Sequence, residues 1–307
     1  MLPRRSFLRT LAAGAAAPVL ARAGAPEPFR LRHVLASALY GGLPLADVLP
    51  EVAKVGAEGI DIWCQVHGTQ REQIDAMGDE AFAALLARHR VRLIASTRYP
   101  LGPFGLQPEI AWLRRHGGGI VVTGSRGPRA PQGAEAKVAV QAFLEQMKPH
   151  VAAAEAAGVT IAIENHGSQM LCHPDSLRWF AELNRSRHLG VAFAPHHLHP
   201  WSDEIPRLVR DLGAGQLPFV YLQEHNEGIS RQVAKEIELR QLPGFGGGLD
   251  WRELVRALRD IRFTGWVEIF MHPTPRGIPI LPTLPEVTAA VTRARAHIDQ
   301  CLREVAG

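Results

Sequence analysis

The 307-residue sequence contains only three cysteines, and no two of them form a Cys-x-x-Cys pair. Cys64, Cys172 and Cys301 are widely spaced, so they indicate neither a disulfide framework nor a zinc knuckle. Buried free thiols are the simpler expectation. Long apolar runs are also missing, because the stretch from Leu11 to Leu20 is shorter than the roughly 20 residues that a membrane span requires. We therefore expect no stable membrane span.

Glycine fingerprints of nucleotide-binding proteins are absent as well. No GxGxxG or GxxxxGK[ST] pattern follows the first predicted strand, which argues against a dinucleotide site or a P-loop. The glycines of segment 244–248 stand instead in a long loop after the seventh predicted strand. Asp250 follows this loop, and we expect it to cap the next helix.

Acidic residues are missing from the first 25 positions, which contain four arginines. The formal net charge of the chain is +4, so those four arginines account for it and the remaining residues are close to neutral. The basic character therefore belongs to the N-terminal segment. We expect no nucleic-acid partner, and an endonuclease activity is disfavoured.

This basic N-terminus has the order of an export signal. The segment RRSFLR (4–9) precedes the apolar stretch, and small residues of the A-x-A type follow at 21–25. The paired arginines with Phe-Leu after them resemble the twin-arginine signal. We predict a twin-arginine signal peptide at 1–25 and a periplasmic location for the exported protein. An ordinary basic N-terminus is the alternative.

Short apolar runs alternate with longer amphipathic stretches from residue 33 onward, which is typical of βα units on a parallel sheet. Helical periodicity is clearest at 45–55, 78–89, 135–157, 250–260 and 284–304. Eight strands with intervening helices favour a closed (β/α)8 TIM barrel over an open sheet. The eight predicted strands are 33–39, 58–63, 91–97, 119–123, 159–164, 189–194, 218–223 and 265–270.

Polar residues follow the last four of these strands, where the active sites of such barrels form. Side chains alternate along a strand, so Ala162 and Glu164 share the inner face of the fifth strand. By the same count Glu268 and Phe270 share the inner face of the eighth. We therefore expect both glutamates to point into one pocket. The strand-end clusters are Glu164-Asn165-His166, Pro195-His196-His197, Gln223-Glu224-His225-Asn226 and Glu268.

Three segments carry a resemblance to a known family: IENHG (163–167), LPGFGGGLDW (242–251) and GWVEIFMHPTPRGIPI (265–280). They resemble the sugar phosphate isomerase/epimerase family with a xylose-isomerase-like TIM barrel, and the resemblance covers the chain after residue 30. It implies a single barrel domain at 30–307 and a small carbohydrate substrate. Members hold a divalent metal with a Glu, an Asp, a His and a Glu that end strands five to eight. One glutamate removes a proton beside a carbonyl and the other returns it.

Glu164 and Glu268 match the two glutamates of this pattern and are the predicted catalytic residues. The other two ligands are replaced, because Ala194 stands where the family has Asp and Tyr221 stands near the position of the His. A divalent ion (Mn²⁺, Co²⁺, Mg²⁺ or Zn²⁺) could be held by a mixed nitrogen and oxygen set. The alternative is a metal-free arrangement of ion pairs. The predicted ligands are Glu164, His196, Gln223 and Glu268.

Further residues at the same end of the barrel are candidates for substrate binding. His197 matches the substrate-contacting histidine of the family. Arg126 and Arg276 follow strand ends and could hold a hydroxyl-rich or carboxylate substrate, although a solvated rim is the alternative for each. Trp63, Tyr99 and Trp251 could form an apolar wall for a sugar. The full set of predicted substrate-binding residues is His166, His197, His225, Arg126 and Arg276.

These observations predict an isomerase or epimerase acting on a sugar or sugar derivative. Export favours a substrate without phosphate, because sugar phosphates are intracellular metabolites. Two alternatives stay open: a lyase that acts on an oxidised (keto) glycoside, and a non-catalytic carbohydrate-binding barrel that has lost its metal. A C-terminal helix after the proline-rich segment 273–285 is compatible with a homodimer.

Overall fold

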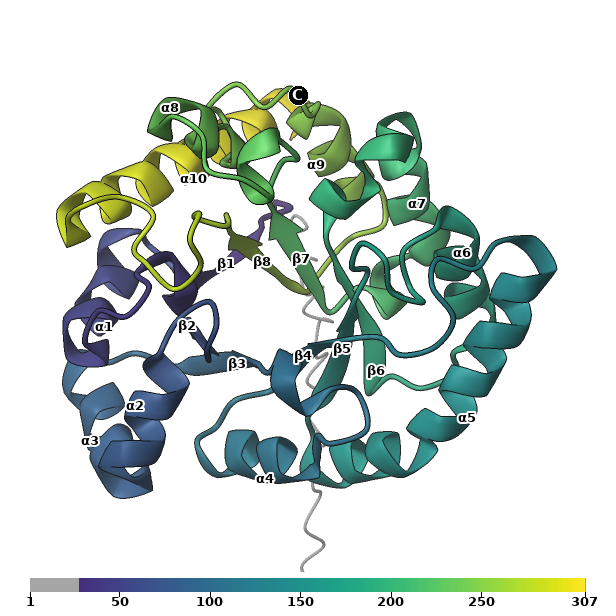
Figure 1. Ribbon diagram of the computed structural model, residues 1–307, viewed down its shortest axis with the longest axis horizontal. Coiled ribbons are helices and arrows are strands. Elements are labelled where there is room, and N and C mark those ends of the chain that lie inside the picture. The colour runs from purple at the N-terminus through teal and green to yellow at the C-terminus, as the bar shows by residue number, and fades with distance from the viewer. Residues whose placement is uncertain (1–27, 307) are drawn as a thin grey trace, which may run out of the picture.

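A closed barrel of eight parallel strands, arranged in chain order, forms the centre of the molecule (Figure 1). The computed structural model describes residues 28–306, so the predicted signal peptide at 1–25 lies outside the described part. Strand β1 pairs with β8 and closes the ring. Each strand overlaps its predicted range, and the predicted TIM barrel is confirmed. The strands are β1 (Arg32–Ala36), β2 (Ile60–Trp63), β3 (Leu93–Thr97), β4 (Ile120–Gly124), β5 (Thr160–Glu164), β6 (Leu189–Phe193), β7 (Phe219–Leu222) and β8 (Trp266–Ile269).

Helices surround the barrel on its outside (Figure 1). The five predicted helical segments correspond to α1, α3, α5, α9 and α10. The α-helices are α1 (Leu45–Lys54), α2 (Gln70–Met77), α3 (Asp79–His89), α4 (Gln107–Arg115), α5 (Gly133–Ala157), α6 (Pro174–Leu183), α7 (Ile205–Leu212), α8 (Lys235–Glu238), α9 (Trp251–Asp260) and α10 (Leu284–Ala306). Short 3₁₀ helices are η1 (Ser37–Leu39), η2 (Tyr99–Leu101), η3 (Pro195–Glu204), η4 (Ala214–Gln216), η5 (Glu227–Ile229) and η6 (Leu239–Gln241).

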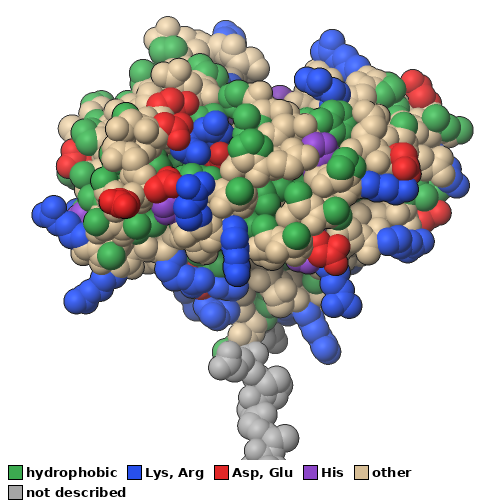
Figure 2. Space-filling view, turned by 90° about the horizontal axis from the view of Figure 1, so that it is seen from below, with side chains coloured by type: hydrophobic (Ala, Val, Ile, Leu, Met, Phe, Trp, Pro, Cys, Tyr) green, Lys and Arg blue, Asp and Glu red, His purple; other side chains and the backbone are tan. Residues whose placement is uncertain are grey.

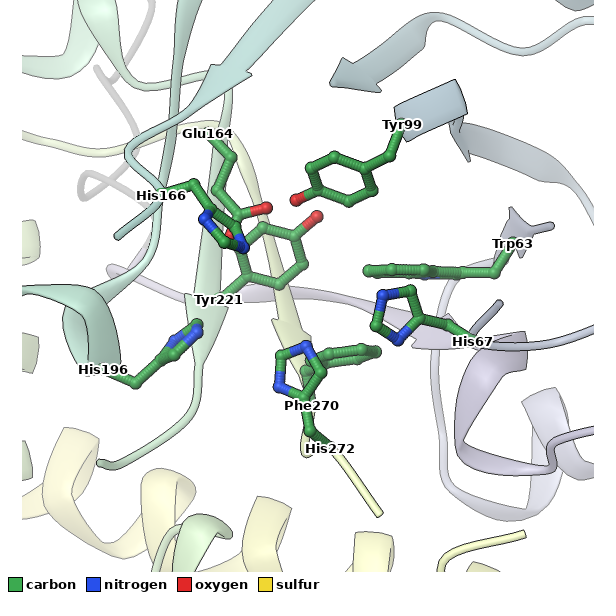
Figure 3. A pocket seen from close by; sticks show the side chains of 9 residues that line it. All are labelled: Trp63, His67, Tyr99, Glu164, His166, His196, Tyr221, Phe270 and His272. Carbon is green, nitrogen blue, oxygen red and sulfur yellow. The ribbon is translucent and has the colours of Figure 1, made fainter. Parts of the chain in front are cut away.

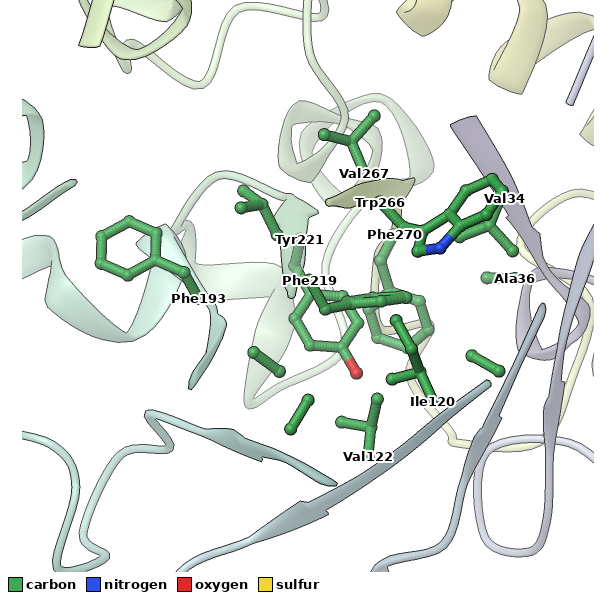
Figure 4. Packing of buried hydrophobic residues seen from close by; sticks show 14 of the residues in the cluster. Val34, Ala36, Ile120, Val122, Phe193, Phe219, Tyr221, Trp266, Val267 and Phe270 are labelled. Carbon is green, nitrogen blue, oxygen red and sulfur yellow. The ribbon is translucent and has the colours of Figure 1, made fainter. Parts of the chain in front are cut away.

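The strand side chains alternate between the barrel interior and the layer under the helices (Figure 4). Phe219, Tyr221 and Phe270 turn toward the centre of the barrel, whereas Phe193 and Val267 point away from it. All five are buried, because helices cover the outer face and side chains fill the inner one. The alternation predicted for the eighth strand is therefore confirmed.

The loop between β7 and α9 is fastened to the end of β7 by Glu224. This carboxylate accepts hydrogen bonds from Trp251 Nε1 at 2.6 Å and from the backbone N–H of Leu249 at 2.9 Å. A Cβ at Gly247 would lie 2.2 Å from Glu224 Oε2, so only glycine permits this close approach. Asp250 caps α9 as predicted, because its Oδ1 accepts the backbone N–H of Arg252 at 3.0 Å.

The surface carries both signs of charge. Figure 2 shows Lys and Arg side chains together with Asp and Glu side chains on one face of the molecule. The three cysteines are free and buried, as the sequence predicts. Within residues 28–306, no helix combines the length and the apolar character needed to cross a bilayer.

Candidate active site

A pocket opens among residues at the carboxyl ends of the strands, which is the end of a TIM barrel where active sites form (Figure 3). Its volume is about 70 Å³, which is below the ~300–1,000 Å³ typical of small-molecule sites. The lining residues come from or directly follow strands β2, β3, β5, β6, β7 and β8. They are Trp63, His67, Tyr99, Glu164, His166, His196, Tyr221, Phe270 and His272.

Aromatic rings form one wall of this pocket. Trp63 and Phe270 stack with their ring centroids 4.5 Å apart and an interplanar angle of 10°. Tyr99 and Tyr221 lie within 6.3 Å of Trp63. The predicted wall residues Trp63 and Tyr99 are present, but Trp251 is not, because its indole is held by Glu224. The wall offers a flat apolar surface with two phenolic hydroxyls.

Glu164 is the carboxylate that lines the pocket. It is the last residue of β5 and is only 3% exposed. Burial raises the pKa of this carboxyl to about 7, and the nearby His166 opposes the shift. Its Oε1 atom lies 3.3 Å from Nε2 of His197. A carboxyl with a pKa near neutrality can both accept and release a proton at physiological pH.

Three histidine rings lie next to Glu164. The ring centroids of His166 and His197 are 4.1 Å apart, and those of His196 and His197 are 3.9 Å apart. Burial lowers the pKa of His197 to about 3 and that of His196 well below its usual value. Both rings are therefore neutral at pH 7 and keep a lone pair on one nitrogen.

Asn165 ties the end of β5 to the segment after β6. Its Nδ2 donates to the Ala194 carbonyl at 2.9 Å, and its Oδ1 accepts the Ala194 backbone N–H at 2.7 Å. This pair of hydrogen bonds links Ala194 to the residue that follows Glu164. Asn165 therefore fixes the position of Glu164 relative to His196 and His197.

The protonation of His272 is determined by a chain of hydrogen bonds that starts at the backbone. The backbone of His272 orients the side-chain amide of Gln241. Gln241 Oε1 accepts the His272 N–H at 2.9 Å, and Gln241 Nε2 donates to the His272 carbonyl at 2.9 Å. Gln241 Oε1 also accepts from Gln223 Nε2 at 2.8 Å, which orients the second amide. Gln223 Nε2 in turn lies 2.9 Å from His272 Nδ1. Nδ1 must therefore accept, and the neutral ring carries its proton on Nε2.

Glu268 lies deeper in the barrel than Glu164 does. It is fully buried, it is absent from the pocket lining, and both of its carboxyl oxygens lack a hydrogen bond of good geometry. Burial and the neighbouring Asp61 carboxyl raise the pKa of Glu268 well above its usual value. Burial likewise raises the pKa of Asp61 to about 7. Both glutamates thus point into the barrel, but only Glu164 lines the pocket.

Tyr221 lies beside Glu268 on the neighbouring strand and, unlike Glu268, lines the pocket. Tyr221 and Glu268 are register partners on β7 and β8, and the phenol is 1% exposed. Burial, followed by the carboxyls of Glu164, Glu268 and Asp61, raises the pKa of Tyr221 well above its usual value. The hydroxyl has no hydrogen bond of good geometry. The Tyr221 phenol therefore lies near both glutamates.

Several other predicted site residues do not line the pocket. Gln223 supports His272 through its amide nitrogen instead of lining the pocket. His225 stacks on His199 with centroids 3.5 Å apart and lines a neighbouring pocket with His196. Arg126 is exposed and lines none of the described pockets.

Arg276 lies close to the pocket without lining it. Its guanidinium donates to the Pro273 and Ile229 carbonyls at 2.9 and 2.7 Å. Burial, and after it the charge of Arg276, lowers the pKa of His67 to about 4. Arg276 therefore contributes positive potential near the pocket, whereas two of its nitrogens already have partners.

The sequence patterns at strands five to eight do not indicate three residues of this region. Asp61 has the same strand parity as Trp63, so the alternation rule applied to β2 would have found it. His67 lies in the loop after β2, and no spacing rule marks it. Gln241 belongs to η6 and is distant in the sequence from any strand end, so only the three-dimensional structure connects it to His272.

The metal site implied by the family resemblance does not fit these residues. Ala194 has no donor atom, and the Tyr221 phenol occupies the interior beside Glu268. A different group does bring donor atoms together in residues 28–306. One atom each from Glu164, His166 and His197 lie within 4.8 Å of one another. Of the four predicted ligands, only Glu164 belongs to this group.

Comparison with known families identifies the barrel. The family described as "Xylose isomerase-like TIM barrel" matches residues 49–290. The chain belongs to this family. The match covers most of the barrel, from α1 to α10, and agrees with the resemblance carried by the three sequence segments. No curated protein sequence matches the chain.

Solved members with the xylose-isomerase-like barrel superpose over most of the chain. An L-ribulose 3-epimerase is 18% identical with a TM-score of 0.66, covering 90% of this chain and 96% of its own. The IolI protein with a bound zinc atom is 16% identical with a TM-score of 0.66, covering 90% and 99%. A 3-keto-D-glucoside 4-epimerase from E. coli is 14% identical with a TM-score of 0.62, covering 87% and 100%. At these identities the likeness shows a shared fold.

Proposed function

We propose that the protein is an epimerase or isomerase that moves a proton at a carbon beside a carbonyl in a non-phosphorylated sugar or sugar derivative. The observation that carries this proposal is the setting of Glu164, a buried carboxyl with a pKa of about 7 in a pocket lined by aromatic rings and imidazoles. The similarity to an L-ribulose 3-epimerase and a 3-keto-D-glucoside 4-epimerase supports the same class of reaction.

The pocket lining supports a substrate without phosphate. None of its nine residues is a lysine or an arginine. A phosphate group is bound most often by such cations or by helix N-termini. The lining instead presents hydroxyls, imidazoles and flat rings, which suit the hydroxyl groups and the apolar face of a sugar.

Glu164 takes the proton in the proposed mechanism. The C–H electron pair moves into the carbon framework and the carbonyl oxygen becomes an enediolate oxygen. His272 donates a hydrogen bond from Nε2 to that oxygen, since its Nδ1 is occupied by Gln223. A neutral imidazole is suited to this role because Nε2–H stabilises the developing charge without first losing a proton.

Tyr221 returns the proton in the epimerase form of the mechanism. Its hydroxyl and the Glu164 carboxyl both face the pocket (Figure 3). The Tyr221 O–H gives its proton to the carbon as the carbonyl re-forms, and the protonated carboxyl of Glu268 resupplies the phenolate. Glu268, predicted to act directly, then acts through Tyr221. Direct return of the proton by Glu164 gives the isomerase form.

The test is a substrate panel. Ketoses, aldoses and 3-keto-glycosides are incubated with the purified protein, each beside its phosphorylated counterpart, and products are followed by NMR. Epimer or isomer formation from a non-phosphorylated member supports the proposal, and Glu164→Gln abolishes it. Glu155→Gln, an exposed change on α5, is the matched control and retains activity. Release of an aglycone from a keto-glycoside would identify a lyase instead, and binding without turnover would identify a carbohydrate-binding barrel.

Export is part of the proposal and rests on the segment 1–25 alone. Replacement of the arginine pair, Arg4→Lys with Arg5→Lys, removes the feature that the twin-arginine pathway recognises. Cell fractionation then finds the protein in the periplasm for the natural sequence and in the cytoplasm for the variant. Equal distribution of the two proteins would contradict twin-arginine export.

A further inference from the structure

We propose that Glu164, His166 and His197 bind a divalent cation of the Zn²⁺ or Co²⁺ class at a position displaced from the one implied by the family resemblance. The inference deepens the proposed function, on which it rests for the use of the ion. Binding of the ion can be measured without any substrate.

The spacing of the donor atoms fits a metal ion. All three atoms lie within 4.8 Å of one another, and Glu164 Oε1 is 3.3 Å from His197 Nε2. In a tetrahedral site with bonds of about 2.1 Å, the ligand atoms lie roughly 3.4 Å apart. The carboxylate oxygen and the imidazole nitrogen are therefore already at the separation that a shared cation requires.

No hydrogen bond explains the contact between Glu164 and His197. His197 Nε2 is buried and has no hydrogen-bond partner, although the carboxylate oxygen is only 3.3 Å away. Two buried polar atoms that approach each other without a hydrogen bond of good geometry are unfavourable unless a third group satisfies them. A divalent cation satisfies both atoms at once.

The hydrogen bond at Nδ1 of His166 leaves Nε2 as the atom that can bind a metal. His166 Nδ1 lies 2.9 Å from the Gly167 carbonyl oxygen, which can only accept, so Nδ1 carries the proton. Nε2 is then left with its lone pair. Metal-bound histidines commonly donate their other ring N–H to a backbone carbonyl, because this fixes the ring orientation and the tautomer.

The ligand set favours one class of ion. Two imidazoles and one carboxylate are suited to Zn²⁺ and Co²⁺, whereas Mg²⁺ and Ca²⁺ prefer oxygen ligands alone. Three protein ligands leave a coordination position open, as in catalytic zinc sites. Bound there, the ion would supply a Lewis acid for a sugar oxygen.

The displacement follows from two substitutions at the family's ligand positions. The Ala194 side chain provides no donor, and the buried Tyr221 phenol lies near both Glu164 and Glu268. Asp61 is the carboxyl that acts most strongly on Glu268, and Glu268 is absent from the group of donor atoms around Glu164. The histidines after β5 and β6 supply the missing donors.

The experiment measures metal binding by the purified protein after chelator treatment, by titration with Zn²⁺ and by the visible absorption of the Co²⁺ form. We expect about one ion per chain and a four- or five-coordinate Co²⁺ spectrum. His166→Gln and His197→Gln weaken Zn²⁺ binding by at least 100-fold. Glu268→Gln and His225→Gln, the matched controls, leave it unchanged. Circular dichroism and thermal unfolding confirm that each variant is folded.

Two results would overturn the inference. Loss of the ion in Glu268→Gln with retention in His197→Gln would place the metal at the family position. Absence of Zn²⁺ and Co²⁺ binding in the natural protein would exclude the site altogether. Sugar conversion is measured in parallel, so that conversion by a metal-free protein rejects only the metal site, whereas metal binding without conversion rejects only the proposed function.

Discussion

Glu164 and Glu268 match the same family pattern, yet they lie in two different environments within one barrel. Glu164 ends β5, lines the pocket and has His166 and His197 beside it. Glu268 lies buried in the interior, beside Tyr221 and close to the Asp61 carboxyl. A residue that matches a family pattern therefore need not have the environment that the pattern implies. With Ala194 and Tyr221 at the two other ligand positions, Glu164 and Glu268 are no longer equivalent carboxylates.

The largest expected effect separates the two glutamates directly. Glu164→Gln removes the base that contacts the substrate, so kcat falls by about 10²–10⁴-fold. Glu268→Gln acts only through Tyr221, and kcat falls by roughly tenfold or less, since Glu268 does not contact the substrate itself. Steady-state kinetics on the best substrate of the panel measures both. Equal losses in the two variants would contradict the division of roles.

Tyr221→Phe tests the residue that lies near both glutamates. The variant loses the proposed proton donor but keeps Glu164, so epimerisation falls by roughly 10²-fold. Exchange of the substrate proton with solvent continues, because Glu164 still removes and returns it. The ratio of exchange to conversion therefore rises. An unchanged ratio would remove Tyr221 from the proton transfer.

Gln223→Leu tests the support of His272, which acts as a positioning interaction. Without the amide, Nδ1 is no longer held as an acceptor and the ring can change tautomer. We expect kcat to fall by roughly tenfold with KM little changed, since the lost stabilisation is that of the enediolate. The ¹⁵N chemical shifts of His272 report the tautomer. The same ¹⁵N shifts of His272 in the variant as in the natural protein would contradict this role.

The smallest expected effect is the pH dependence of stability at Asp61. Its pKa is about 7 in the folded protein, above its usual value, because burial disfavours the charged form. A raised pKa means that the folded state holds the proton more tightly, so this contribution is complete below about pH 4 and is lost as the pH rises to 7.

Asp61→Asn removes that contribution. The Tm of the natural protein minus that of the variant should therefore decrease by a few degrees between pH 4 and pH 7. Thermal unfolding monitored by circular dichroism measures the difference, and Asp203→Asn, an exposed change in η3, is the control. A difference that grows with pH would show that Asp61 is ionised in the folded state.

The sequence alone was sufficient to predict the barrel fold and the inward direction of both glutamate side chains. Alternating strands and helices predict eight βα units, and parity predicts that Glu164 and Glu268 face inward. Parity does not give the height of a side chain in the barrel. Glu164 is the last residue of β5, whereas Phe270 and His272 follow Glu268 and line the pocket in its place.

The supporting network could not be predicted for a different reason. Gln241 reaches His272 from η6, and Asp61 reaches Glu268 from β2, which is separated from β8 by β1 alone. These contacts join residues far apart in the sequence, and no local spacing connects them. The histidines after β5 and β6 were recognised individually, but their distance from Glu164 depends on Asn165 bridging the two strand ends.

The most direct test of the central claim is deuterium incorporation from D₂O into a non-phosphorylated keto sugar, followed by ¹H NMR for the natural protein and for Glu164→Gln. The account predicts that the signal of the proton beside the carbonyl disappears with the natural protein and persists with the variant. Exchange at the same rate with Glu164→Gln would contradict the assignment of Glu164 as the base.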